Sequence, residues 1–298
     1  STSVENARAR AVTTVNSGPA GGVVAAAYYG RLHSRDKIVS VDMGGTSFDI
    51  GLIEDGVSKV TTEGEFQGLP VKIPIIDLHI IGAGGGSIAW IDPGGAINVG
   101  PRSAGAEPGP ACYGKGGTEP TVTDAKLITG VLNPEYFANG QFRLDENRAR
   151  LAMQGVADGL DCSVEEAAVA IIRTVDANMI NALKLVSIQR GHDPRDFALV
   201  VGGGGGAMHG APLGRELGVK EVVIPIHPGL FSAWGMLATE PRRDFMQTAL
   251  SRAEDIAIEK IRDIQRYFGI SRSRDTDRPT ISRHNRLGRP RLHSVFSG

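Results

Sequence analysis

The sequence predicts an α/β fold in which a mixed β-sheet is flanked by helices. Short β-branched runs separated by glycine turns predict strands within residues 38–62 and again within 197–226. Between these two regions, the capping box Ser163-Val164-Glu165-Glu166 opens a long run of helical periodicity. Strands before and after a long helix place the chain among the α/β proteins.

Residues 41–50, with the sequence VDMGGTSFDI, predict a strand, a tight glycine turn and a second strand. Strand alternation after the turn assigns two sets of residues to opposite faces: Phe48, Ile50 and Leu52 on one, and Asp49, Gly51 and Ile53 on the other. The turn re-enters a strand and not a helix. This argues against a P-loop and against the dinucleotide-binding fingerprint, both of which open a helix.

The residue types of this turn suit a bound phosphate. Gly44 and Gly45 let backbone N–H groups approach a phosphate closely, and the hydroxyls of Thr46 and Ser47 can bond its oxygens. Asp42, at the end of the first strand, can hold a hydrated Mg²⁺ beside that phosphate. A plain glycine hairpin is the alternative. Three short strands around a carboxylate-bearing glycine turn suggest the start of an RNase-H-like or actin-like ATPase lobe.

The composition excludes several classes of protein. The chain of 298 residues has an ordinary apolar content of 41% and a net charge of −1, which gives no case for a nucleic-acid-binding or membrane-binding surface. Cys112 and Cys162 form neither a disulfide framework nor a metal-binding spacing. Because the sequence also shows no membrane-spanning apolar run and no signal segment, a reduced, cytoplasmic protein is expected.

A carboxylate and an imidazole lie two residues apart in the apolar segment 73–81. Residues at this spacing on a strand share a face, so Asp77 and His79 could jointly approach a metal or a substrate proton. The alternative is a salt-bridged pair at a strand edge. The glycine-rich run 82–87 follows directly and could form a second backbone cradle.

A further glycine loop occupies residues 202–206. The predicted strand 197–201 precedes it, and a short helix at 211–217 and a strand at 219–226 follow, which is a nucleotide-binding arrangement. The dinucleotide fingerprint is matched trivially by five glycines, and no acidic residue ends the following strand. An adenosine-side loop of an actin-like ATPase fits as well. His209 could contact the base or the substrate, or could cap the helix.

Several element boundaries are predicted from local signals. Ser17 is expected to cap a helix with Pro19 in its first turn, and Gly191 is expected to end the long helix. The Gly- and Pro-rich stretch 90–123 is predicted to be a long functional loop without secondary structure. Asp124 is expected to cap the helix that follows it.

The composition changes near residue 250. Residues 1–250 are predicted to form one core ATPase-like domain, and residues 251–298 an Arg-rich, disordered or aberrant tail. Residues 256–268 could form an amphipathic helix within that tail. A basic tail could contact nucleic acid, but this one contains no nucleic-acid-binding motif and few aromatic residues between its basic ones.

Four stretches together resemble the hydantoinase A / 5-oxoprolinase family. They are residues 17–22 (SGPAGG), residues 42–49 (DMGGTSFD), the run 81–124 that contains GAEPGPACYG, and residues 202–217. Each motif is loose alone, but their order and spacing cover residues 14–245. Sugar kinases and chaperones of the same ATPase fold do not show the long Gly- and Pro-rich run.

The resemblance implies an actin-like, two-lobed ATPase fold. It implies that ATP activates an amide or carbonyl oxygen as a phosphorylated intermediate, after which amidohydrolase members open a small cyclic amide with water. Carboxylase relatives act instead on acetone or acetophenone. A hydantoinase B-type subunit usually completes the reaction, so a homo- or hetero-oligomer is expected.

The resemblance also assigns site residues. It implies that Asp42 holds Mg²⁺ through water, that the β- and γ-phosphates of ATP contact Gly44, Gly45, Thr46 and Ser47, and that the adenosine borders Gly203, Gly204, Gly205 and Gly206. Asp77 and His79 are the candidate catalytic residues on the substrate side, where a second divalent metal is also considered.

Two departures from the family pattern leave alternatives open. Family members carry an earlier Asp-Gly-Gly-Thr phosphate loop, which is expected to lie upstream of Ser1, and the tail lacks the family's closing elements. The first hypothesis is a subunit or fragment of an ATP-dependent cyclic-amide hydrolase of the hydantoinase, N-methylhydantoinase or 5-oxoprolinase type. The others are a subunit of an acetone or acetophenone carboxylase, which the residues do not separate from the first, and a truncated non-catalytic assembly module.

Overall fold

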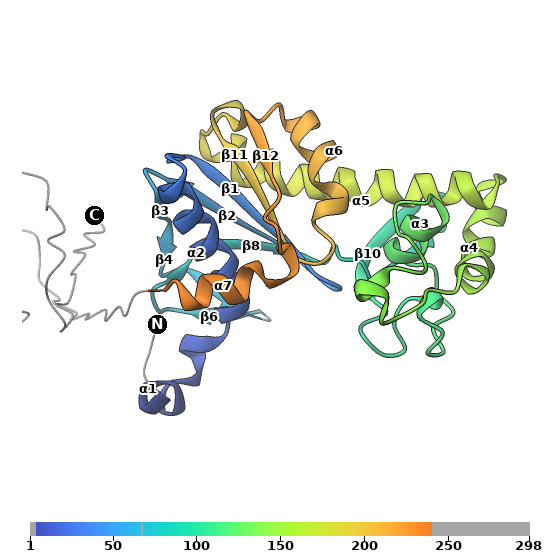
Figure 1. Cartoon of the computed structure of the whole chain (residues 1–298), viewed down its shortest axis with the longest axis horizontal. Helices are drawn as coiled ribbons and strands as arrows, with labels where there is room; N and C mark the ends of the chain where they lie inside the picture. The colour runs from blue at the N-terminus through green and yellow to red at the C-terminus, as the bar shows by residue number, and fades with distance from the viewer. Residues whose placement is uncertain (1–3, 67, 240–298) are drawn as a thin grey trace, which may run out of the picture. The chain divides into compact units, whose positions relative to one another are not determined.

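The computed structural model of the chain describes residues 4–66 and 68–239 (Figure 1). The chain divides into two compact units, and the larger one consists of Thr14–Thr239. This unit lies within the core domain that the sequence predicts for residues 1–250, and it contains every candidate site residue.

The smaller unit joins Ser1–Thr13 to Glu240–Gly298. Its described part contains the short helix α1 (Val4–Ala9). The tail predicted for residues 251–298 and the helix predicted for 256–268 lie outside the described residues. Both stay predictions.

The larger unit alternates strands and helices. In chain order they are α2 (Ser17–Leu32), β1 (Ile38–Met43), β2 (Phe48–Glu54), β3 (Val57–Ser58), β4 (Val60–Thr61), β5 (Gly64–Phe66), β6 (Leu69–Val71), β7 (Ile75–Ile76), β8 (Leu78–Ile81), β9 (Ser87–Ile91), β10 (Ile97–Ser103), α3 (Val122–Ile128), α4 (Glu146–Leu160), α5 (Val164–Val186), β11 (Ala198–Gly202), α6 (Ala207–Leu217), β12 (Glu221–Val223) and α7 (Phe231–Leu237). Short 3₁₀ turns are η1 (Ala11–Thr14), η2 (Ala111–Tyr113), η3 (Phe137–Gly140), η4 (Ile188–Arg190), η5 (Pro194–Asp196) and η6 (Pro228–Leu230).

A six-stranded mixed sheet forms the centre of this unit, in the order β12-β11-β1-β2-β3, with β8 also paired to β2. β1 and β12 run parallel to β11, whereas β2 runs antiparallel to β1, β3 and β8. The parallel register pairs Ile38 with Ala198 and Asp42 with Gly202. The turn after β1 and the glycine loop after β11 therefore leave the sheet at the same edge. The predicted mixed α/β sheet is confirmed.

Side chains of the strands alternate between two hydrophobic cores. On one face, α2 and α7 cover Ile38, Ile53 and Val200. The other face carries a larger core under α5 and α6 that continues into α3 and α4, and its β2 members are Phe48, Ile50 and Leu52. The alternation predicted for β2 is thus confirmed, and it leaves Asp49 on the face of α2 and α7.

The capping box predicted for the long helix is present in α5. The Ser163 hydroxyl accepts from the Glu166 amide, and the Glu166 carboxylate accepts from the Ser163 amide at 2.9 Å. The predicted stop at Gly191 is wrong for α5, which ends at Val186. There the Ser187 hydroxyl bonds the Leu183 carbonyl, and Gly191 ends the following turn η4 in the left-handed region (φ +83°).

The stretch predicted as a structureless loop contains a hairpin. β9, which begins just before this stretch at Ser87, pairs antiparallel with β10, and Asp92 holds their turn by accepting from the amides of Gly94 and Ala96. Asp124 is not the cap of α3. Thr121 caps that helix, and Asp124 is its capping-box partner three residues later. The prediction chose the wrong one of the two, because both side chains can bond a helix N-terminus.

Three other boundaries differ from the predictions by a few residues. The cap position of α2 belongs to Asn16, so Ser17 is the first helical residue. α6 begins four residues early, at Ala207, because the amide of Gly210 already bonds the Gly206 carbonyl. β12 is short because it pairs on one side only, with three residues of β11.

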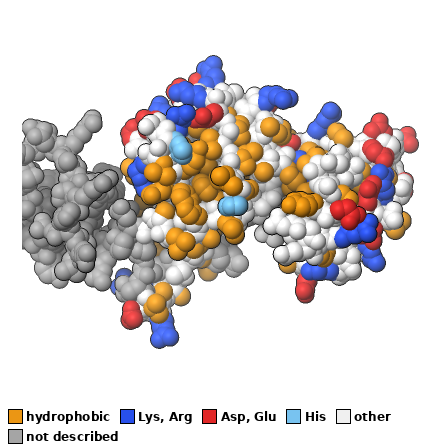
Figure 2. All heavy atoms as spheres, viewed as in Figure 1, with side chains coloured by type: hydrophobic (Ala, Val, Ile, Leu, Met, Phe, Trp, Pro, Cys, Tyr) orange, Lys and Arg blue, Asp and Glu red, His pale blue; other side chains and the backbone are white. Residues whose placement is uncertain are grey.

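Hydrophobic side chains gather on the surface over α2 and α7, whereas charged side chains are more frequent near α3 and α4 (Figures 1 and 2). Leu230, Trp234, Met236 and Leu237 are exposed apolar residues of this region, and Leu237 is 87% exposed. Single exposed apolar residues are ordinary, but a contiguous group is typical of a surface that contacts another protein.

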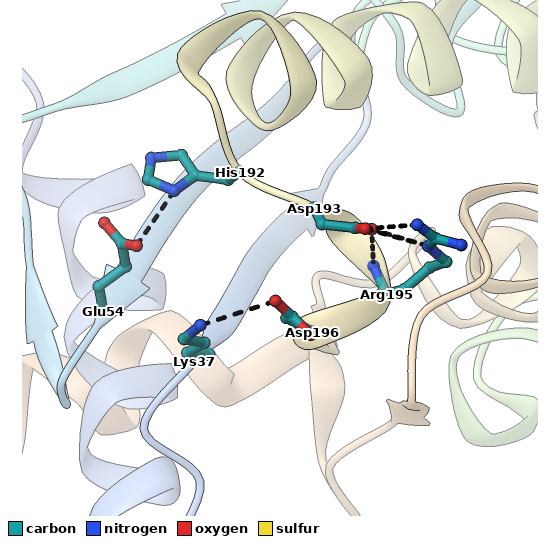
Figure 3. Close-up of polar contacts among 6 residues, drawn as sticks. All are labelled: Lys37, Glu54, His192, Asp193, Arg195 and Asp196. Atoms are coloured by element: carbon teal, nitrogen blue, oxygen red, sulfur yellow. Dashed lines mark hydrogen bonds and ion pairs between the residues drawn. The ribbon is translucent and has the colours of Figure 1, made fainter.

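A charged cluster links the segment after α5 to the end of the sheet that is far from Asp42 (Figure 3). Glu54 bonds Nδ1 of His192 at 3.1 Å, and Lys37 lies 3.8 Å from Asp196. The ammonium of Lys59 is 2.9 Å from Nε2 of His192 and 3.0 Å from Glu54. Both ring nitrogens of His192 are thereby engaged, which gives this cluster a structural role.

Both cysteines are free thiols, as predicted, and Cys112 is buried. Across residues 4–66 and 68–239, no helix has the combined length and apolar character needed to cross a bilayer.

Replacing Gly235 with alanine tests the contact between α2 and α7. A Cβ at Gly235 would lie 1.9 Å from the Gly21 carbonyl oxygen and 2.8 Å from Ala25, so the helices would have to separate. We expect Gly235→Ala to lower the free energy of unfolding by about 2 kcal/mol, measured by urea denaturation. The control is Gly155→Ala on exposed α4, where no atom lies within 4 Å; it should stabilise by less than about 1 kcal/mol. A wild-type urea midpoint for Gly235→Ala would contradict this packing.

Candidate functional site

Two carboxylates stand side by side at one edge of the sheet. Asp42 of β1 is directly opposite Asp49 of β2 in the antiparallel register. Opposed residues of such a pair share a face and have Cα atoms about 5 Å apart. Both side chains therefore lie on the face covered by α2 and α7.

The Asp42 carboxylate is enclosed by residues from three other segments. Ser232, at the start of α7, donates its hydroxyl to Asp42 Oδ2. A Cβ on Gly22 of α2 would lie 3.3 Å from the same oxygen, and a Cβ on Gly203 would lie 2.5 Å from Oδ1. Only glycine fits at position 203, which also has a φ of +83°. Ser232 carries no recognisable local signal, and the sequence analysis missed it.

The turn between β1 and β2 has bonded carbonyls and open amides. The carbonyls of Gly44 and Gly45 accept from the amides of Gly85 and Gly86 at 3.1 and 2.7 Å. Within the described part of the chain, the amides of Gly45, Thr46 and Ser47 make no hydrogen bond, and no atom lies within 4 Å of a Cβ built on Gly44 or Gly45. Consecutive free amides beside open space are an anion-binding arrangement.

The glycine run 82–87 supports this turn from behind. A Cβ on Gly84 would lie 2.5 Å from the backbone of Gly45 and Thr46. Thr123 of α3 in turn donates its hydroxyl to the Gly85 carbonyl at 2.8 Å. The run that the sequence analysis considered as a second cradle donates its amides to the protein and acts as a buttress.

The loop after β11 contacts the same turn from the other side. The amide of Gly205 donates to the Met43 carbonyl at 2.9 Å, and the amide of Gly203 donates to Pro228 at 2.8 Å. Gly204 between them is exposed. The two glycine segments predicted to form one nucleotide site are therefore linked through Met43, the residue that leads into the turn after β1.

Within the carboxylate pair, Asp49 has a raised pKa. Burial raises the pKa of Asp49 to about 6, a hydrogen bond to Ser47 lowers it, and the charge of Asp42 raises it further. Asp49 Oδ1 is buried without a hydrogen-bond partner among the described residues. A partly buried carboxyl of raised pKa beside a second carboxylate is typical of a functional site. In the sequence, Asp49 stands out only as a member of the strand alternation.

These residues fit a magnesium ion. Mg²⁺ keeps much of its water shell and is held by one or two carboxylates together with phosphate oxygens. Asp42 and Asp49 supply two carboxylates, and the unpartnered Asp49 Oδ1 needs a cation or a donor. Over the residues that the structure describes, no group of three or more His, Cys, Asp or Glu residues is placed to hold a metal ion.

Asp77 and His79 lie apart from this pair. The Asp77 carboxylate bonds Arg190 at 2.5 Å, so the ion pair considered as the alternative forms with Arg190 and not with His79. His79 is opposite Ile50, whose side chain belongs to the core under α5, on the other face of the sheet from Asp42. Burial, followed by the charge of Arg190, lowers the pKa of His79, while Asp77 raises it. Their catalytic role stays a prediction.

His209 is fully buried, and its Nδ1 bonds Asp176 of α5. The residue is in the first turn of α6, so it neither caps that helix nor is exposed next to the loop. Asp176 is 33 residues away in the sequence, and no local pattern connects the two.

Comparison with known proteins identifies the relatives of this chain. The family model described as Hydantoinase/oxoprolinase matches residues 1–245. The chain is 44% identical over 249 residues to caprolactamase subunit alpha of Pseudomonas jessenii, which covers 83% of this chain and 36% of that subunit. It is 40% identical over 225 residues to the acetophenone carboxylase gamma subunit of Aromatoleum aromaticum, covering 74% and 30%.

The same likeness extends to a solved structure. Nucleotide-free acetone carboxylase matches with a TM-score of 0.69 at 34% identity, covering 73% of this chain and 31% of that one. The chain thus has the mixed α/β fold of this ATP-dependent relative. The chain spans about a third of the length of the relatives described here. By the match over residues 1–245, it belongs to the hydantoinase/oxoprolinase family.

Proposed function

We propose that this chain is the ATP-binding part of an ATP-dependent cyclic-amide hydrolase, which activates the amide carbonyl by phosphorylation. The open amides of Gly45, Thr46 and Ser47, next to the paired carboxylates of Asp42 and Asp49, support this proposal most directly. The identity of 44% to a caprolactamase subunit supports a cyclic amide as the substrate.

The proposed roles follow from the chemistry of each group. The three free amides and the Thr46 and Ser47 hydroxyls bind phosphate oxygens, and Asp42 and Asp49 hold a hydrated Mg²⁺. Residues 203–206 border the adenosine. When bound, MgATP supplies the phosphoryl group. Transfer of that group needs mainly positioning and neutralisation of charge, which fixed amides and a cation provide.

A ketone carboxylase subunit is the second candidate. The TM-score of 0.69 to acetone carboxylase and the 40% identity to an acetophenone carboxylase subunit favour it. Phosphate-binding residues serve either reaction, because both activate a carbonyl oxygen.

The proposal includes a partner subunit of the hydantoinase B type in a hetero-oligomer. Two relatives are subunits of larger enzymes, and the exposed apolar residues around α7 (Figure 2) offer a surface for assembly. The cytoplasmic location expected for a protein with two free thiols belongs to the same proposal.

The activity itself can be measured in an assembly reconstituted with the hydantoinase B-type subunit. We expect hydantoin, 5-oxoproline or caprolactam to stimulate ATP hydrolysis, and Asp42→Asn to reduce the stimulated rate at least about 100-fold. Asp55→Asn, in the exposed turn after β2, is the matched control and should keep the wild-type rate. Stimulation by acetone or acetophenone alone would select the carboxylase, and stimulation by neither class would contradict both candidates.

Gly45→Ala separates phosphate binding from stability. The added methyl meets no atom within 4 Å, so the melting temperature should not change, but it occupies the open side of the turn. We expect at least about tenfold weaker binding of a non-hydrolysable ATP analogue with Mg²⁺, measured by calorimetry. Gly84→Ala is the contrast, because its Cβ would clash with the backbone at 2.5 Å and should lower stability as well. Unchanged affinity in Gly45→Ala would rule out this turn as the phosphate site.

The raised pKa of Asp49 predicts a pH dependence of the metal-free protein. The folded state holds this proton up to about pH 6, whereas the unfolded chain releases it near pH 3.8. Stability therefore falls as pH rises through this window, because the folded state binds more protons there. Asp49→Asn should remove this decline in urea midpoints measured in EDTA between pH 4 and pH 7, and Asp55→Asn should not. Parallel wild-type and Asp49→Asn profiles would refute the assignment.

A further inference from the structure

Two buried polar side chains, His209 and Lys126, meet the half-buried Asp176 at the start of α6, directly after the glycine loop. His209 is fully buried and bonds Asp176 of α5 through Nδ1. Lys126 of α3, only 3% exposed, donates its ammonium to the carbonyl of Met208 at 3.0 Å. Two different helices thus hold two consecutive residues of the first turn of α6.

The start of α6 has no cap of its own. Its cap position is Gly206, which offers no side chain to bond the first free amides. The first turn is instead bonded to the loop, since the amides of Met208 and His209 donate to Gly205 and Gly206. Gly205 in turn donates to Met43, the residue after Asp42. A displacement of His209 would therefore be transmitted to the turn after β1.

Packing alone does not account for the imidazole. Nε2 of His209 is buried and has no partner among the described residues, a cost that a hydrocarbon side chain would avoid. A hydrocarbon side chain at position 209 could not form the hydrogen bond that His209 makes with Asp176. Burial lowers the pKa of the Lys126 ammonium, and the Asp176 carboxylate opposes this by favouring its charged form. A carboxylate next to the first turn of α6 further suits the helix dipole.

One helix connects this anchor to the other glycine segment. Thr123 and Lys126 are three residues apart on α3 and so share a face. Thr123 bonds the Gly85 carbonyl behind the phosphate turn, and Lys126 bonds the Met208 carbonyl beside it. α3 therefore braces the segments on both sides of the turn.

We propose that Asp176, His209 and Lys126 are positioning residues, which hold the loop of residues 203–206 against the turn after β1. The bracing is a property of the ligand-free protein. Its consequence for nucleotide binding rests on the proposed function above.

Amide hydrogen exchange of residues 203–206 in the ligand-free protein tests the bracing. We expect His209→Ala and Lys126→Met to speed this exchange at least about tenfold. His209→Asn, whose amide can keep the bond to Asp176, should retain slow exchange, whereas His209→Gln should not. Lys184→Met is the matched control, because it removes the exposed ion pair between α5 and Glu216 of α6 and should change nothing.

Calorimetry with a Mg²⁺-bound ATP analogue gives the second measurement. Affinity should fall about tenfold in His209→Ala and Lys126→Met and recover in His209→Asn. Asp42→Asn should lose binding while its exchange at residues 203–206 stays that of the wild type. If the wild-type protein fails to bind the analogue, the proposed function fails, and the exchange data alone decide the bracing.

The bracing is overturned by wild-type exchange in His209→Ala and Lys126→Met, or by an equal effect of Lys184→Met. Rescue by His209→Gln and not by His209→Asn would also overturn it, because Nε2 would then be the working atom. Where the alanine variant does not fold, this contrast between asparagine and glutamine decides.

Discussion

Close contact of backbone with backbone around the turn after β1 is the constraint on which the site depends. Gly85 and Gly86 approach the carbonyls of Gly44 and Gly45 from behind, and a side chain at Gly84 would not fit. With its carbonyls bonded to this run, the turn keeps three amides that make no hydrogen bond within the described residues. The same contact that fixes the turn therefore also supports the proposed phosphate site, and it requires glycine at position 84.

The pairing of β1 with β2 has an electrostatic cost. It places Asp42 opposite Asp49, and like charges directly opposed on a sheet are destabilising. Ser232 relieves Asp42, whereas Asp49 keeps a buried oxygen without a partner in the described structure. An arrangement that opposes stability is typical of a functional site. A cation held between the carboxylates would remove the repulsion and satisfy the orphaned oxygen together.

The part of this site that could be predicted is local in sequence. Residues 41–50 carry their strand, turn and alternation in one stretch, and residues 202–206 are marked by glycine alone, so both segments were found. Ser232 reaches Asp42 across 190 residues, and Asp176 reaches His209 across 33, so no periodicity or spacing could connect them. The hairpin of β9 and β10 was missed because glycine and proline give the same signal in a long loop and in a tight turn between two strands.

The faces of the sheet bear on where substrate chemistry takes place. A phosphoryl donor and its acceptor must lie within about 3.5 Å in a reactive arrangement. Asp42 and Asp49 lie on the face of α2 and α7, whereas His79 lies on the α5 face and Asp77 is engaged by Arg190. Direct action of His79 at a phosphate bound beside Asp42 would thus have to come from the opposite face of the sheet. In the proposed function, the acceptor carbonyl would instead bind beside the amides of the turn that make no hydrogen bond, because in-line transfer needs donor and acceptor together.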